Sequence, residues 1–251
     1  MSQSARRAIQ VLEFVINAHA PVGLMQVADD LHIDKSTAAR TLSVLESESL
    51  LHRDSSSKAY SAGRRLLSMS VQVLSRLDLR RVARPLLEEF ATLTGETVSL
   101  HVRVGDTRLC VDGVESTQAI RRVVPFGESA PLPSGPAGKV ILAYLPPDEC
   151  RRILTFYLTP AQVRTVTQQL DLVVRNGYMA AIGDRSPGAG ALAGAVLVNG
   201  RPVASVTAAG PGDRWTVERM KAFHAPLREI LEQLGAVPIS AMLRDPQIGA
   251  E

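Results

Sequence analysis

The sequence predicts an α+β protein in two parts, a helical N-terminal part that ends in a β-hairpin and a larger C-terminal part in which helices pack on an antiparallel sheet. Three observations predict this class. Apolar residues recur at helical spacing through the first 50 residues, and two short extended segments follow. From about residue 80, runs typical of strands are flanked by helical segments. Asn199–Gly200 joins two apolar runs, a pattern that indicates a hairpin.

The N-terminal part begins with two predicted helices. Residues 4–18 place Ala8, Val11, Leu12, Val15 and Ile16 at helical spacing, and Pro21 and Gly23 end that pattern. Residues 24–31 form a second, shorter helix, and the segment "HID" is a tight connection to the next one.

A third helix is predicted over residues 35–47. Asp34 precedes it, and its carboxylate can reach the free N–H groups of the first turn. Ala38, Leu42 and Leu45 fall on one face and form the core side of this helix. The segments "LLHRD" and "AYSAG" then flank a polar tip at residues 54–58, which indicates a hairpin. Three helices followed by a hairpin make a winged helix-turn-helix.

Residues 64–78 predict a further helix with an unusually wide apolar stripe, formed by Leu66, Leu67, Met69, Val71, Val73, Leu74 and Leu77. We interpret it as a linker between two domains. The predicted organisation is therefore a winged helix-turn-helix over 1–63, a linker helix over 64–79 and a second domain over 80–251.

The C-terminal part alternates between helices and strands. A helix over 80–94 ends at Gly95, and a loop rich in proline and glycine, "FGESAPLPSGPAG", interrupts the pattern later. Helices are predicted over 136–145, 147–155, 160–176 and 216–234. Strands are predicted over 97–104, 108–114, 119–124, 190–198 and 203–209.

Composition and charge narrow the class of protein. No apolar run is long enough to span a bilayer, the N-terminus does not read as a secretory signal, and the two cysteines read as reduced thiols, so a cytoplasmic protein is expected. The formal net charge is +3, and residues 1–80 hold ten Lys or Arg against eight Asp or Glu. Because this excess is small, any surface for nucleic acid must depend on where the charges are placed.

The face of the 35–47 helix opposite its core carries short polar side chains and one guanidinium. These are Ser36, Thr37, Arg40, Ser43 and Ser47, and Lys35 adds a further cation at the start of the helix. A slim, hydrogen-bonding helix face fits the major groove of DNA, and an arginine can bind a guanine edge with two hydrogen bonds. Arg53, Lys58 and Tyr60 of the hairpin are candidates for a second contact with phosphates. The alternative for both elements is an ordinary solvated surface.

Several segments together resemble the IclR family of bacterial transcription regulators. They are "SARRAIQVLEF", "DKSTAARTLSVLESESLL", "AYSAGRRLLSM", "FGESAPLPSGPAGKVILAYLPP", "VVRNGY", "SPGAGALAGAVL" and "VASVTAAGP", which cover nearly the whole chain in order. The resemblance implies a GAF-like effector-binding domain after the linker helix. It also implies a homodimer or a dimer of dimers that binds an operator in double-stranded DNA.

The resemblance also implies where an effector binds. Residues 134–139, "SGPAGK", are not a phosphate loop, because Pro133 and Val140 replace the residues that such a loop needs. A helix start there offers N–H groups that suit a carboxylate, so we expect a small organic acid. The carried-over effector positions are Ser134, Gly135, Pro136, Ala137, Asp184, Leu192, Thr207 and Ala209. At several of these the family has more polar residues, which predicts a more apolar pocket.

No residue pattern predicts an enzyme, a metal site or a cofactor. The five histidines are scattered, and no nucleophile or paired-carboxylate motif is present. His101, Arg121 and Arg122 are candidates for binding an acid, although single residues of this kind are more often solvated or paired. The sequence therefore predicts a ligand-responsive regulator of a catabolic operon. Two alternatives remain: a DNA-binding protein whose C-terminal domain serves only oligomerisation, and a GAF-fold enzyme.

Overall fold

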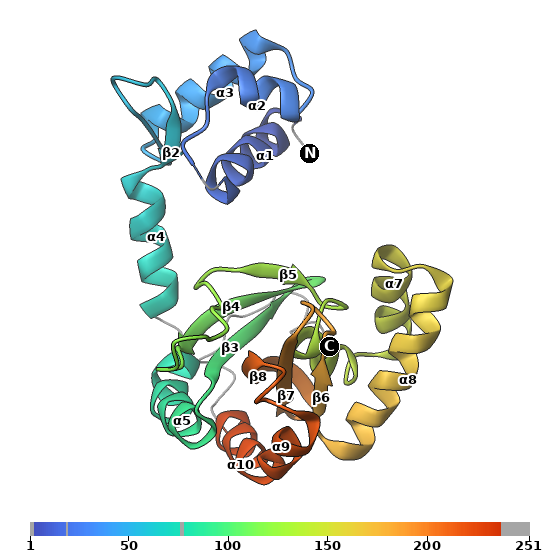
Figure 1. Cartoon of the computed structure of the whole chain (residues 1–251). Coiled ribbons are helices and arrows are strands. Elements are labelled where there is room, and N and C mark those ends of the chain that lie inside the picture. Colours follow the sequence, from blue (N-terminus) through green and yellow to red (C-terminus); the bar gives the residue numbers. More distant parts are fainter. Residues whose placement is uncertain (1–2, 19, 76–77, 237–251) are drawn as a thin grey trace. The chain divides into compact units, whose positions relative to one another are not determined.

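The computed structural model describes residues 3–18, 20–75 and 78–236, and the chain divides into two compact units, Met1–Arg76 and Leu77–Glu251 (Figure 1). The side chains of residues 70–78 are outside this description. Within the described residues, no helix is long and apolar enough to cross a membrane. Each unit has a hydrophobic core of its own.

The first unit has a core of three helices and a small hairpin, and a fourth helix follows the hairpin. Helices α1 (Gln3–Asn17), α2 (Leu24–Asp30) and α3 (Lys35–Ser47) lie within a residue of the ranges predicted from sequence. Their core includes Val11, Val15, Val27, Ala38, Leu42 and Leu45. Asp34 occupies the N-cap position of α3 with extended backbone, but its side chain makes no capping hydrogen bond.

The hairpin follows α3 directly. Strand β1 (Leu51–Arg53) pairs antiparallel with β2 (Tyr60–Ala62), and Tyr60 also forms a bridge to Val22, which ties the hairpin to the α1–α2 connection. Helix α4 (Arg64–Ser75) then begins where the linker helix was predicted. The predicted range continued to residue 78, and residues 76–77 lie outside the described part.

The second unit contains a six-stranded antiparallel sheet in the order β5-β4-β3-β8-β7-β6. Its strands are β3 (Thr97–Val104), β4 (Thr107–Val114), β5 (Ser129–Pro131), β6 (Met179–Ile182), β7 (Ala189–Val198) and β8 (Arg201–Pro211). The turn between β7 and β8 has positive φ at Asn199 (50°) and Gly200 (74°), as a two-residue primed turn requires. The α+β class and the antiparallel sheet are therefore confirmed.

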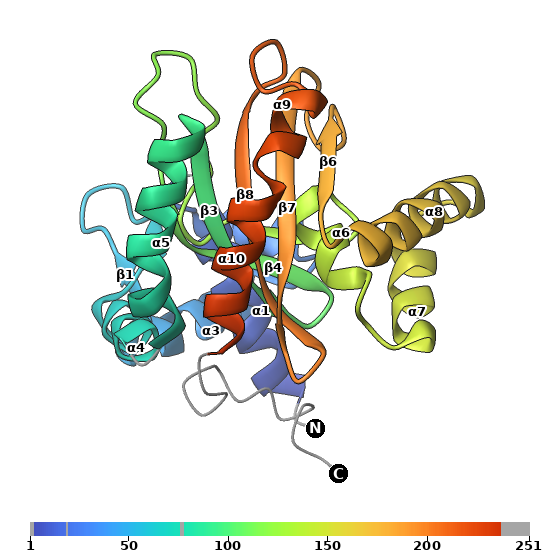
Figure 2. The same ribbon diagram turned by 90° about the horizontal axis from the view of Figure 1, so that it is seen from below.

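Helices cover the two faces of this sheet differently (Figure 2). Helices α5 (Asp78–Thr94), α9 (Val217–Ala222) and α10 (His224–Gly235) pack on one face, against Val98, Leu100, Leu192, Val196 and Val206. Helix α6 (Pro136–Leu142) packs on the other face over β7 and β8, supported by α7 (Pro147–Tyr157) and α8 (Pro160–Asn176). Because side chains alternate along each strand, residue parity decides which face a residue serves.

The structure differs from the prediction in three respects. Residues 119–124, predicted as a strand, have no regular structure, because the edge of β4 is paired instead with β5 and, through the Cys110 N–H, with the carbonyl of Glu128. The short strands β5 and β6 were not predicted. The final helix is two helices, because the chain bends at Phe223 between α9 and α10.

Candidate functional site

The outer face of α3 presents the side chains that the sequence pointed to. Lys35, Ser36, Arg40 and Ser43 are exposed, and Thr37 is half-buried, while Ala38 and Leu42 hold the opposite face in the core. Ser47 is exposed and donates a hydrogen bond to the carbonyl of Val44. The described side chains leave this face slim, with Arg40 as a long cation in its middle.

The hairpin tip is organised by one carboxylate. Asp54 accepts hydrogen bonds from the N–H groups of Ser56 (3.0 Å) and Ser57 (2.7 Å) and from both of their hydroxyls. These hydrogen bonds hold the pKa of Asp54 well below its usual value. Lys58, directly after Ser57, has positive φ (59°) and an exposed side chain. The tip therefore has a defined conformation that holds Lys58 at the surface.

Tyr60 is a correction to the expected DNA contacts. Tyr60 is buried in the core of the first unit, where its backbone forms a β-bridge with Val22. The Arg53 guanidinium lies 5.5 Å from the centre of the Tyr60 ring. Tyr60 thus supports the hairpin from inside, whereas Arg53 and Lys58 remain exposed.

A cavity of about 50 Å³ lies on the α6 face of the sheet, and we call it the sheet cavity. Six of the eight expected effector positions line it: Gly135, Pro136, Ala137, Asp184, Thr207 and Ala209. His101 and Arg122 also line it, whereas Arg121 instead pairs with Glu115 (2.9 Å). The expected residues Ser134 and Leu192 are not part of its wall.

Leu192 lies on the opposite face of the sheet. It is fully buried in the core beneath α5 and α10, because its neighbours Ala191 and Ala193 take the other parity of β7. Ala191 and Gly190 line the sheet cavity in its place. An error of one residue in a strand moves a side chain to the other face, which explains this correction.

The floor of the sheet cavity contains a buried polar chain across β3 and β4. Arg108 Nη1 lies 3.1 Å from His101 Nδ1, and Ser99 Oγ lies 2.9 Å from His101 Nε2. Because a guanidinium only donates hydrogen bonds, Nδ1 is the acceptor, so the proton of the neutral ring sits on Nε2 and is donated to Ser99. The hydroxyl proton of Ser99 remains to be donated elsewhere.

Burial and neighbouring charges set the protonation states of His101 and Arg108 in this floor. Burial, together with the positive charges of Arg108 and Arg185, holds the pKa of His101 well below its usual value, so the ring is neutral. Burial and the neighbouring Arg185 lower the pKa of Arg108 to about 10, which still leaves the guanidinium charged at neutral pH. The floor therefore holds one positive charge, on Arg108.

Two ion pairs flank the sheet cavity. Asp184 pairs with the buried Lys139 of α6, whose ammonium also donates to Gln169 Oε1 (2.9 Å). Arg185 pairs with Glu128. Both carboxylates are thus committed to other cations, and each has one buried oxygen that accepts no hydrogen bond from the described residues.

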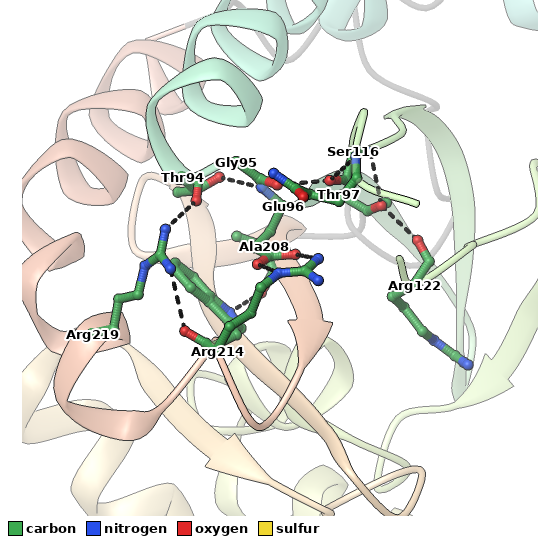
Figure 3. A network of polar contacts seen from close by, with 11 residues as sticks. Thr94, Gly95, Glu96, Thr97, Ser116, Arg122, Ala208, Arg214 and Arg219 are labelled. Carbon is green, nitrogen blue, oxygen red and sulfur yellow. Dashed lines mark hydrogen bonds and ion pairs between the residues drawn. The ribbon is translucent and has the colours of Figure 1, made fainter. Parts of the chain in front are cut away.

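A hydrogen-bond network fixes the segment that carries Arg122 (Figure 3). Thr97 Oγ1 donates to the Arg122 carbonyl (2.5 Å) and accepts from the Ser116 N–H (3.1 Å), and Ser116 Oγ donates to the Gly95 carbonyl (2.7 Å). In Figure 3 the Arg122 side chain points away from this network. The backbone of the cavity rim is therefore anchored at the junction of α5 and β3.

Sequence reasoning missed Ser99, Arg108 and Arg185 as cavity residues. Arg108 begins an apolar run after a turn, where an arginine is normally solvated, and only the strand register shows that it lies on the cavity face with His101. The available signal was the alternation Ser99–His101 opposite Ser205–Thr207, which makes one face of β3 and β8 polar. Among the described residues no group of three or more His, Cys, Asp or Glu is placed to hold a metal ion.

Comparison with known proteins assigns both units to one family. The family model described as IclR helix-turn-helix domain matches residues 4–55, and the model described as Bacterial transcriptional regulator IclR C-terminal matches residues 71–236. HTH-type transcriptional regulator KipR of Bacillus subtilis is 31% identical over 194 residues, which cover 74% of this chain and 77% of KipR.

Solved structures share the fold along almost the whole chain. An IclR transcriptional regulator from Alicyclobacillus acidocaldarius has a TM-score of 0.79 and 25% identity, and the match covers 94% of this chain and 98% of that one. An IclR homologue from Microbacterium hydrocarbonoxydans, solved with 4-hydroxybenzoate, has a TM-score of 0.78 and 20% identity, with coverage of 93% and 98%. This chain belongs to the IclR family of bacterial transcriptional regulators, which are DNA-binding proteins and not enzymes.

Proposed function

We propose that this regulator binds operator DNA through α3 and the β1–β2 hairpin and releases or engages that DNA in response to a small organic acid. The expected DNA contacts are Lys35, Ser36, Thr37, Arg40, Ser43, Arg53 and Lys58. We further propose that the operon under its control is catabolic. The acid would then be a compound that the encoded enzymes consume.

The exposed polar face of α3 supports the DNA-binding half of this proposal. Arg40 is long enough to form two hydrogen bonds with a guanine edge, and the hydroxyls near the helix start suit phosphate oxygens. Lys58 is held at the tip of a rigid hairpin, where it can meet the backbone beside the groove.

The sheet cavity supports the ligand-binding half, and its lining is the observation that carries the proposal. It lies between the sheet and α6, and it holds a buried arginine whose charge no carboxylate of the described residues pairs within 4 Å. A ligand with a negative charge is what such a lining favours. The homologue with 4-hydroxybenzoate shares only the fold at 20% identity, so the ligand class rests on the cavity itself.

We also propose that the protein binds DNA as a homodimer. One winged helix-turn-helix covers few base pairs, so two are needed for affinity and for a two-fold operator. Large apolar side chains are exposed on α1, at Ile9 and Ile16, and on α4, at Leu67 and Met69. These faces fit a self-complementary contact between two copies. The predicted stripe residues Val71, Val73, Leu74 and Leu77 lie outside the described side chains.

The test uses gel-shift titrations with DNA from upstream of the gene and from neighbouring catabolic operons, with and without a panel of small acids. Arg40→Ala should weaken binding to the operator, whereas Arg164→Ala, which removes the same charge from an exposed site on α8, should bind normally. Light scattering on the complex should give an even number of chains. Equal affinity of both variants for the operator would refute the assignment of α3.

A further inference from the structure

We propose that Gly63 and Arg65 are positioning residues that set the spacing between the two half-sites of the operator, because they fix the direction of α4 relative to α3. The inference rests on the proposed binding of DNA by a homodimer and specifies which operators that dimer accepts. Both residues act through residues 48–50, the connection between α3 and β1, which we call the α3–β1 turn. Neither needs to touch a base.

Backbone hydrogen bonds tie the start of α4 to the α3–β1 turn. Helix α4 continues from β2 through a single residue, Gly63 (Figure 1). The Gly63 N–H donates to the Leu50 carbonyl (2.9 Å), and the Arg65 N–H donates to the Ser49 carbonyl (3.0 Å). The turn is itself held to α3, because the Leu50 N–H donates to the Leu45 carbonyl (2.9 Å). The two helices are therefore joined through fixed backbone.

Gly63 allows an approach to this turn that no residue with a Cβ could make. A Cβ at Gly63 would lie 2.3 Å from the Ser49 carbonyl oxygen and 2.8 Å from the Leu50 carbonyl carbon. The φ of Gly63 is not positive, so glycine is needed here for space and not for an unusual backbone angle. Because the obstructing atoms belong to the backbone, an added methyl group must push α4 away from the turn.

The Arg65 side chain ties α4 to the same turn from the outside. Its guanidinium forms an ion pair with the Glu48 carboxylate and also donates to the Glu48 carbonyl (3.3 Å). Glu48 is the C-cap residue of α3. The two side chains are 53% and 56% exposed, so the pair contributes little to stability. What it restricts is the direction of α4, because one guanidinium holds two groups of the same residue.

A fixed joint makes α3 move together with α4. The proposed dimer surface includes Leu67 and Met69, which are exposed on α4. When two copies join there, the angle between α3 and α4 decides how far apart their α3 helices lie. The two helices can enter the major groove together only where the half-sites have a matching separation, such as one helical turn of about 34–36 Å. The joint therefore selects the spacing, whereas α3 selects the half-site sequence.

The displacement expected from a methyl group at Gly63 is comparable to one base-pair step. Restoring a contact distance of 3.4 Å from 2.3 Å requires about 1 Å of movement. Across the radius of a helix, roughly 5 Å, this movement corresponds to a tilt of about 12°. Helix α4 has 12 residues and is therefore about 18 Å long, so its far end would move by about 4 Å. Successive base pairs are about 3.4 Å apart.

The test is a selection of bound DNA from a pool of random duplexes by the full-length protein. Sequencing of the bound DNA reports the half-site sequence and the spacing separately. The test variants are Gly63→Ala and Arg65→Met. Gly23→Ala is the matched glycine control, because a Cβ at Gly23 meets no atom within 4 Å and the backbone there is extended. Arg64→Met is the matched charge control, because it removes an equal charge from the adjacent, exposed position of α4.

The wild type and both control variants should select two half-sites at one spacing. Gly63→Ala should select the same half-site sequence at a spacing that differs by about one base pair. Arg65→Met should accept a wider range of spacings around that of the wild type. A residue that only supported the fold would lower the affinity for every sequence and would leave the preferred spacing unchanged.

Wild-type spacing in a folded Gly63→Ala, or an unchanged range of spacings in Arg65→Met, would overturn the positioning role of that residue and leave the proposed DNA binding intact. Loss of binding even to single half-sites in a folded Gly63→Ala would also overturn its role, since Gly63 would then serve the DNA-binding unit itself. If the wild type selected no repeated half-site, the proposed function would be contradicted. If circular dichroism shows that Gly63→Ala does not fold, the range of spacings of Arg65→Met decides the inference by itself.

Discussion

Replacing Arg214 should destabilise the second unit strongly, although Arg214 lies outside the cavity. Glu96, at the junction of α5 and β3, is only 1% exposed, and Arg214 binds both of its oxygens, at 2.6 Å through Nε and 2.8 Å through Nη2 (Figure 3). Gly210 leaves the room that this carboxylate fills, since a Cβ there would lie 2.1 Å from Glu96 Oε2. No alternative cation is paired with Glu96 among the described residues.

The magnitude follows from this geometry. Breaking a buried ion pair by removing one partner costs about 3–5 kcal/mol, because the other charge remains buried without compensation. The Arg214 side chain is 31% exposed, so water can partly reach the pair, and we expect about 3 kcal/mol for Arg214→Met. At about 2–4 °C per kcal/mol for a domain of this size, the melting temperature should fall by about 6–12 °C.

Urea and thermal unfolding followed by circular dichroism measure this loss. The double variant Glu96→Met/Arg214→Met should recover most of the lost stability, because it removes both charges. Arg228→Met is the control, since Arg228 pairs at 3.7 Å with an exposed glutamate and should change stability very little. A loss below about 1 kcal/mol in Arg214→Met, or a double variant as unstable as the sum of the single ones, would refute this reasoning.

Four further predictions test the DNA-binding face, the cavity rim and the cavity floor. Arg40→Ala should cost about 1–3 kcal/mol on the native operator in gel-shift titrations, and unchanged affinity would exclude a base contact. Lys58→Ala should weaken binding to all DNA sequences alike and reduce the slope of log affinity against log salt by about 1. Thr97→Val removes the hydroxyl that anchors the Arg122 carbonyl, so the affinity for a small acid in the sheet cavity should fall while the operator is still bound; equal affinity for the acid would show that the anchor is dispensable. Burial, Arg108 and Arg185 lower the pKa of His101, so the unfolded chain binds a proton near pH 6.5 that the folded chain does not. The neutral His101 therefore contributes folding stability that is present above pH 6.5 and is lost as the pH falls, by about 1.4 kcal/mol per pH unit below 6.5. In urea titrations, the difference in unfolding free energy between pH 7.5 and pH 5.5 should be smaller for His101→Gln than for the wild type.

The elements that the sequence predicted well are those with local signals. Helix α8 has the predicted bounds, because Thr159 and Gln162 form a capping box at its start and Gly177 ends it with a positive φ of 81°. The recognition face of α3 also follows from local spacing, since its three core residues fix which side is exposed.

The predictions that were wrong concern features that depend on contacts between distant segments. Residues 119–124 contain enough β-branched residues for a strand, but the sheet offers them no partner, because residues 128–131 occupy the edge of β4. The prediction that Leu192 lines the pocket was wrong for a related reason. The face of the sheet that Leu192 occupies depends on the register between β7 and β8, which the sequence does not specify to one residue.

The lining of the cavity also combines features that the sequence indicated with features that depend on contacts between distant segments. The sequence predicted a more apolar pocket from the residues on the last two strands; β7 supplies Ala189, Gly190 and Ala191 to the wall, and β8 supplies Thr207 and Ala209. Besides Thr207 of β8, the polar groups on the sheet come from β3 and β4, where strand pairing brings Ser99 and Arg108 together, and neither stood out in the sequence. One side of the cavity is therefore apolar and the other carries hydrogen-bond donors. A lining divided in this way favours a ligand with a charged end and a short carbon body, which neither set of residues indicates alone.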